Sequence, residues 1–66
     1  MKVGDKLKCK NDINNLYGDP LFIKDNIYEI LYIDEQNEVI VLNHVLYANE
    51  YAEQTMMYVR DNFDII

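Results

Sequence analysis

The sequence predicts a single, mainly β domain that folds as a small barrel of five to six strands with one short C-terminal helix. Three observations support this prediction. Short stretches either alternate between apolar and polar residues, as at residues 6–10 and 45–51, or are apolar on both faces, as at residues 27–33, and both patterns are typical of strands. Clusters of turn-forming residues separate these stretches. A length of 66 residues allows one hydrophobic core, so we expect one domain covering residues 1–66.

The first predicted strand, residues 6–10, has one apolar face and one basic face. Leu7 and Cys9 alternate with three lysines, so a period of two directs the apolar side chains inward. We therefore interpret Cys9 as a buried structural thiol. It is the only cysteine, which excludes an intramolecular disulfide and suggests a reducing cytosol.

A long loop and a short edge strand are expected next. Residues 11–20 are rich in Asn, Asp, Gly and Pro, which predicts a ten-residue loop. Pro20 removes a backbone donor, so the following strand, residues 21–24, should lie near a sheet edge. Asp25 and Asn26 then predict a two-residue hairpin turn.

Residues 27–33 form the strongest predicted strand, because both of its faces are apolar. A period of two places Tyr28, Ile30 and Tyr32 on one face. Apolar side chains on both faces suit the middle of a tightly curved barrel. Two further strands are expected at residues 38–43 and 45–51.

The apolar period changes near the C-terminus. Met56, Val59 and Phe63 recur at i, i+3 and i+7, and Thr55 is an acceptable N-cap, so we expect a helix over residues 55–62. The last two residues would then close the barrel as a terminal strand. This order, with a long loop, three meandering strands, a short helix and a final strand, is that of a small SH3-like barrel.

Three segments also carry a family resemblance: residues 3–9 (VGDKLKC), residues 22–30 (FIKDNIYEI) and residues 59–63 (VRDNF). Together they resemble the small SH3-like β-barrel proteins encoded by bacteriophages. In that group a KGKxYEV hairpin lies at the middle strands, and Asp25 stands here where the pattern has glycine. The resemblance implies the fold; most members have no assigned function, and the others mostly act by binding something.

Charge is distributed unevenly along the chain. Residues 1–24 contain five lysines and three aspartates, a balance of +2, whereas residues 25–66 contain nine carboxylates and one arginine, a balance of −8. Carboxylates repel nucleic-acid phosphates and attract basic protein surfaces. The pattern therefore favours a protein partner. A plainer interpretation is that the charge only keeps a small domain in solution.

No motif predicts catalysis, a metal site or a cofactor. The chain has no serine, which excludes a serine triad, and Gly4 and Gly18 do not form a phosphate-binding loop. The acidic run at residues 34–38 lacks the length and the glycine of a calcium loop. His44 has no partner at a recognisable motif spacing, so we interpret it as hydrogen-bonded or solvated. We expect a protein that is not an enzyme.

Tyrosine is the most suggestive residue type that remains. It is enriched among the residues that dominate protein–protein binding energies, and several tyrosines lie among carboxylates in the acidic part of the chain. We expect a host or phage protein with a basic surface as partner, with inhibition of a defence effector or a nucleic-acid enzyme as the use. The predicted partner-binding residues are Tyr47, Glu50, Tyr51, Glu53, Tyr58, Asp61 and Asp64.

Two other functions stay open at this point. One is an oligomer that sequesters a small ligand or nucleotide at its subunit interfaces. The other is a nucleic-acid-binding barrel that uses its basic first strand, through Lys2, Lys6, Lys8 and Lys10. No apolar run exceeds four residues, so we expect no membrane span and a location in the cytoplasm of a bacterial host.

Overall fold

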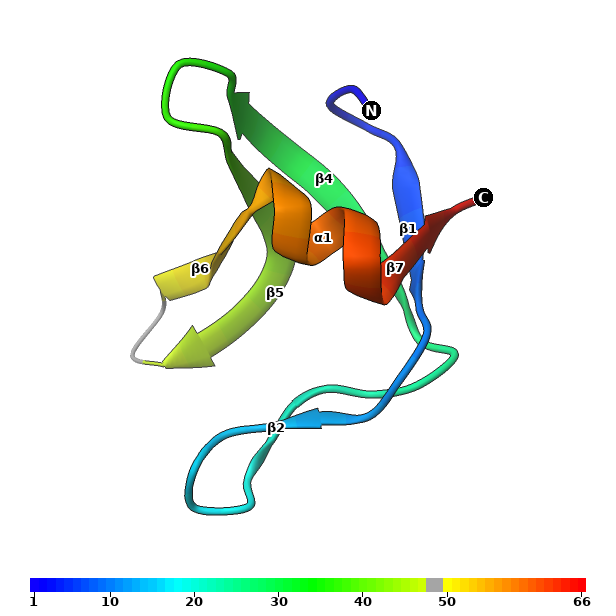
Figure 1. Cartoon of the computed structure of the whole chain (residues 1–66), viewed down its shortest axis with the longest axis vertical. Helices are drawn as coiled ribbons and strands as arrows, with labels where there is room; N and C mark the ends of the chain where they lie inside the picture. The colour runs from blue at the N-terminus through cyan, green and yellow to red at the C-terminus, as the bar shows by residue number, and fades with distance from the viewer. Residues whose placement is uncertain (48–49) are drawn as a thin grey trace.

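The computed structural model describes the backbone of residues 1–47 and 50–66 and the side chains of residues 1–45 and 51–66. The described part is mainly β, with one short helix near the C-terminus, as predicted (Figure 1). The elements are β1 (Lys6–Cys9), β2 (Ile13–Asn14), β3 (Pro20–Phe22), β4 (Ile27–Asp34), β5 (Val39–Tyr47), β6 (Glu50–Thr55), α1 (Met56–Asn62) and β7 (Phe63–Ile65).

The strands form two antiparallel sheets. The larger has five strands in the order β6-β5-β4-β1-β7 among the described residues, and the smaller pairs β2 with β3. Helix α1 connects the two edge strands of the larger sheet and lies across its open side (Figure 1). In the described part of the chain neither sheet closes on itself, so the predicted closed barrel is not confirmed.

The core lies between the larger sheet, the helix and the base of the smaller sheet. Its centre is a cluster of four rings, Phe22, Tyr28, His44 and Phe63, whose centroids lie 5.1–6.0 Å apart, mostly edge to face. Such pairs are stabilising beyond the area that they bury. The buried hydrophobic residues are Leu7, Cys9, Phe22, Tyr28, Ile30, Ile40, Leu42, Ala52, Val59 and Phe63.

The structure differs from the prediction around residues 11–26. The expected loop contains β2, and β3 pairs with β2 instead of forming a hairpin with β4. The turn before β4 is centred one residue earlier than expected, because Asn26 N donates to Ile23 O (3.1 Å). Asp25 has φ +69°, a conformation that glycine adopts freely and that aspartate tolerates better than most residues. The glycine of the family pattern therefore corresponds to a position of positive φ.

Side chains, not strand pairing, attach this small sheet to the rest of the molecule. Phe22 is fully buried in the ring cluster. On either side of it, Tyr28 Oη accepts a hydrogen bond from Ile23 N (3.0 Å), and His44 Nε2 donates to Leu21 O (2.7 Å). His44 thus has a structural role, in agreement with its interpretation as a hydrogen-bonded residue.

A bulge in β4 changes which side chains face the core. The partners Ile30 with Leu42 and Tyr32 with Val41 show that β4 contains one extra residue, Leu31, relative to β5. Because side chains alternate with a period of two, one extra residue turns those that follow to the opposite face. Tyr32 is accordingly 58% exposed, although its predicted face was that of Tyr28 and Ile30.

In the C-terminal half, the predicted strand is corrected and the predicted helix is confirmed. The strand expected at residues 45–51 is divided between the end of β5 and the start of β6, and residues 48–49 lie outside the described part. The helix is confirmed: Thr55 is its N-cap and its Oγ1 accepts a hydrogen bond from Tyr58 N (3.1 Å). The predicted stripe is also correct, because Val59 is buried and Met56 packs against the core.

We predict that Tyr28→Phe lowers the free energy of unfolding by about 1–2 kcal/mol, because the Ile23 amide would lose its acceptor in a partly buried place. Tyr32→Phe is the matched control on the same strand, and its exposed side chain makes a change below about 0.5 kcal/mol the expected result. Urea unfolding followed by circular dichroism measures both. Equal stabilities of the two variants would contradict the proposed anchoring role of Tyr28.

Candidate functional site

The structure divides the predicted partner-binding residues between two places. Tyr51 and Glu53 lie on β6, which is one edge of the larger sheet, whereas Asp64 lies on β7, the opposite edge. Helix α1, which carries Tyr58 and Asp61, spans the distance between them. The side chains of Tyr47 and Glu50 lie outside the described part of the chain.

Tyr51 and Glu53 belong to a surface that the sequence did not predict as a unit. Tyr51 is paired with Val45 across β6 and β5, and Glu53 is paired with Val41, which is paired in turn with Tyr32 on β4. Paired residues point to the same side of a sheet. We call these five residues, Tyr32, Val41, Val45, Tyr51 and Glu53, the outer face.

The outer face is unusually apolar for an exposed surface. The side chains of Tyr32, Val45 and Tyr51 are 58%, 49% and 52% exposed. Sequence reasoning missed Tyr32 because the bulge at Leu31 is not visible in the alternation pattern. It also left open which face of the Val45 strand would be buried. Tyr51 and Glu53 belong to the predicted partner-binding residues, and both are exposed. Which of the tyrosines would be exposed could not be predicted from the sequence.

The second group is less available for binding. Tyr58 is partly buried and packs against the core. Burial raises the pKa of its hydroxyl above the ordinary value, with a smaller contribution from the nearby Cys9 thiol group. Asp64 forms an ion pair with Lys10 (3.5 Å). Asp61 is exposed on the helix.

The basic first strand is not a free cationic surface. It lies between β4 and β7, which belong to the acidic part of the chain, so carboxylates flank its lysines. Lys8 pairs with Asp25 (3.8 Å), and Lys6 stands opposite Glu29 in the sheet register. The uneven charge of the sequence is therefore mixed in space.

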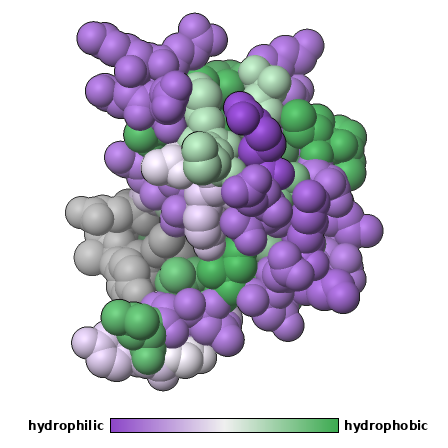
Figure 2. Space-filling model, in the orientation of Figure 1, coloured by the Kyte–Doolittle hydropathy of each residue, from purple (hydrophilic) through white to green (hydrophobic). Residues whose placement is uncertain are grey.

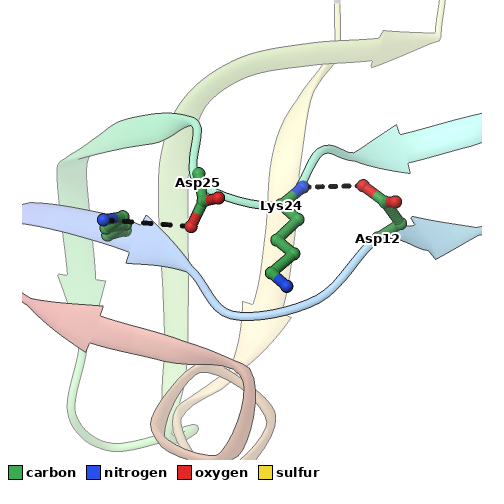
Figure 3. A network of polar contacts seen from close by, with 4 residues as sticks. Asp12, Lys24 and Asp25 are labelled. Atoms are coloured by element: carbon green, nitrogen blue, oxygen red, sulfur yellow. Dashed lines mark hydrogen bonds and ion pairs between the residues drawn. The ribbon is translucent and has the colours of Figure 1, made fainter.

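Figure 3 shows how the same region holds the smaller sheet. Asp25 points toward β1, whereas Asp12 Oδ1 accepts a hydrogen bond from the main-chain amide of Lys24 (2.8 Å). The Asp12 carboxylate therefore stabilises the backbone on the way into the turn at Asp25. Both carboxylates have a structural contact.

The described residues provide little evidence for a reactive group or a metal site. Cys9 is fully buried, as predicted, and its Sγ donates to Asn11 O (2.9 Å). Among the described residues, no group of three or more His, Cys, Asp and Glu side chains is placed to hold a metal ion. No helix in that part of the chain has the length and apolar character needed to span a membrane.

Comparison with known proteins provides no functional assignment, so the candidate site rests on the residues of this chain alone. No protein family, no curated protein and no solved structure matches this chain. On the outer face, predicted binding residues and exposed apolar residues coincide on three paired strands.

Asp34, the last residue of β4, has a pKa that differs from its ordinary value. Asp34 accepts hydrogen bonds from Asn37 Nδ2 (2.8 Å) and Asn37 N (3.2 Å). These bonds, the side-chain bond foremost, lower the pKa of Asp34 below its ordinary value. Because the folded pKa is the lower one, the stabilisation is present above the unfolded value of about 3.9 and is lost as the pH falls through the folded pKa.

We predict that Asn37→Ala raises the pKa of Asp34 toward its ordinary value without restoring it fully, because the main-chain bond remains. Two-dimensional NMR of the side-chain carboxyl carbon over acidic pH measures the change. Asn43→Ala, at an exposed position on β5, should leave the titration of Asp34 unaltered. An Asp34 titration that is the same in both variants would contradict the assigned cause.

Proposed function

We propose that this chain is a non-enzymatic protein-binding module that docks onto a basic surface of a host or phage protein through its outer face. The observation that carries the proposal is that Tyr32, Val45 and Tyr51 are each about half exposed on one side of three paired strands. Val45 and Tyr51 are direct partners, and Tyr32 is the partner of Val41 on the same strand as Val45. Tyrosines are enriched in the centres of protein interfaces.

The scaffold beneath the outer face supports this use. β5 is paired on both sides, with β4 and β6, and the opposite side of these strands holds the buried residues Ile40, Leu42 and Ala52. The side chains therefore stand on a backbone that needs little ordering when a partner binds. Preorganisation of this kind reduces the entropic cost of association.

Charge supports a basic partner. Glu53 is exposed within the outer face, and Glu29 lies on the neighbouring strand β4. Carboxylates beside apolar anchors attract a basic protein surface and disfavour an acidic one. If the partner is a nucleic-acid enzyme, the carboxylates would take the place of substrate phosphates, and binding would be inhibitory.

The nucleic-acid alternative has weaker support. Its lysines on and after β1 have carboxylates as neighbours, at 3.8 Å for Lys8 and 3.5 Å for Lys10. Each such pair reduces the number of free charges that could release counterions from a phosphate backbone. The net charge of −6, in which all the cations are already counted, also disfavours the approach of a phosphate backbone.

The finer description of the fold and origin is part of the same proposal. We take the five-stranded sheet with its bridging helix as an open form of an SH3-like barrel, encoded by a bacteriophage. The support is the strand order, in which the helix joins the two edge strands, together with the family resemblance of the sequence. Binding is the common mode of action of such domains, which suits the outer face.

The test is an affinity pull-down from lysate of the natural bacterial host, with and without nuclease treatment, followed by titration of the purified partner. We expect a near-stoichiometric protein that survives nuclease. Tyr51→Ser and Glu53→Lys should each weaken its binding at least about tenfold, as expected for interface anchors. Combining Glu53→Lys with Glu50→Lys should also flatten the salt dependence.

Glu35→Lys is the matched control, since it reverses an exposed charge in the turn after β4, outside the five residues of the outer face. An affinity within about threefold of the unmodified chain is expected there, because charges outside an interface act mainly through steering. An equal loss for Glu35→Lys and Glu53→Lys would show that only net charge matters. Recovery of nucleic acid in place of a protein would reject the proposal.

A further inference from the structure

The tip of the β2–β3 hairpin exposes two large side chains almost completely. Leu16 is 100% exposed and Tyr17 is 90% exposed, the highest values among the large hydrophobic residues described. Figure 2 shows an apolar spot at this end of the molecule, surrounded by polar surface. Scattered exposed hydrophobic residues are ordinary. Two adjacent ones at the end of a projecting hairpin form a protruding apolar anchor.

Hydrogen bonds fix the backbone of the tip. Asn15 Oδ1 accepts hydrogen bonds from Tyr17 N and Asp19 N, both at 2.9 Å. Main-chain bonds from Asn15 N to Asp19 O (2.9 Å) and from Gly18 N to Asn15 O (3.1 Å) close the turn. Gly18 has φ +85°, which requires glycine or a strained residue. The backbone of the tip therefore needs little ordering when the anchor is buried, and the entropic cost falls on the rotamers of its side chains.

The same chain carries a cavity with the complementary properties. It lies between β1, α1 and β7 and has a volume of about 230 Å³. An apolar cavity of about 150 Å³ is enough to hold a benzene molecule, so this one is large enough for a tyrosine ring. Its lining includes the apolar residues Leu7, Val59, Phe63 and Ile65. It also includes the cations Lys10 and Arg60 and one carboxylate, Asp64.

The hairpin tip and the cavity are complementary in charge as well as in size. Lys10 is paired with Asp64, whereas Arg60 is exposed and makes no ion pair in the described part of the chain. Asp19 is exposed and lies two residues after Tyr17. Insertion of the tyrosine ring would therefore bring a carboxylate to the lining that carries the arginine.

We propose that the hairpin tip of one copy of this chain inserts Tyr17 into the β1–α1–β7 cavity of a second copy, with Asp19 meeting Arg60. The tip cannot fill the cavity of its own molecule, because the hairpin projects away from β1, α1 and β7 (Figure 1). The contact is heterologous, so repeated contacts produce head-to-tail assemblies. Association also adds burial that a domain of this size lacks.

This self-association is separate from the proposed function, because the tip and the cavity share no residue with the outer face. A contact centred on two side chains is smaller than a standard interface, so we expect weak association. Sedimentation velocity and native mass spectrometry at increasing concentration, up to about 1 mM, cover the range of such complexes. The unmodified chain should form species larger than a monomer in this range.

Two variants separate the two halves of the contact. Tyr17→Ser removes the tyrosine of the anchor but keeps the cavity. Arg60→Glu reverses the charge at the cavity but keeps the anchor. Each should weaken association at least about tenfold. An equimolar mixture of the two should form a heterodimer and nothing larger, because one intact tip and one intact cavity remain. Asp19→Lys combined with Arg60→Glu should restore the association of a single chain.

Tyr51→Ser is the control and should associate like the unmodified chain, so failure of this inference can be distinguished from failure of the proposed function. A monomer at every concentration would overturn the inference. So would undiminished association of Tyr17→Ser, which would indicate pairing of the edge strands β6 or β7 instead. A small molecule retained in the cavity, detected by native mass spectrometry, would also overturn it.

Discussion

The packing of Phe22 is the interaction on which the rest of the structure depends. The two sheets share no strand pairing, and this ring joins the smaller one to rings from β4, β5 and β7. A domain of 66 residues buries only about 60% of its unfolded surface, so it has few other contacts to replace this cluster. Tyr28 and His44 add hydrogen bonds to the backbone on both sides of Phe22. The projecting hairpin, and with it the tip, is positioned by these three side chains.

Strand order also determines how the charges are distributed. A basic strand at the edge of a sheet could present its lysines together, but β1 is an inner strand with acidic neighbours on both sides. Its lysines are consequently matched by carboxylates, as at Lys8 and Asp25 (3.8 Å). The balance of charge along a sequence therefore says little about the charge of a surface, because antiparallel pairing brings distant segments together. The apolar outer face, not the negative charge alone, distinguishes the binding surface that we propose.

Local patterns predicted the parts of the fold that local forces determine. The buried face of β1 and the helix with its N-cap Thr55 follow from periodicity and from one side-chain hydrogen bond within a single turn. The pairing of β2 with β3 and the bulge at Leu31 could not be predicted, because both depend on the register between two strands, which the alternation within one strand does not show. For the candidate site, the same distinction applies. The predicted strand ended at Tyr51 and did not include Glu53, although the two residues share β6. Tyr32 joins them only through the register with β5.

The tyrosines show why residue type alone does not assign a role in this protein. Tyr28 is buried and bonded to the backbone, and Tyr32, four residues later, is exposed because one extra residue intervenes. Tyr17 is exposed for a different reason, since a turn closed by hydrogen bonds leaves it no neighbour to pack against. Burying an aromatic side chain is favourable whether the surface that covers it belongs to the same chain or to another. The tyrosines left uncovered at two separate places therefore provide the two surfaces to which we assign the proposed contacts, one with a partner and one with a second copy of the chain.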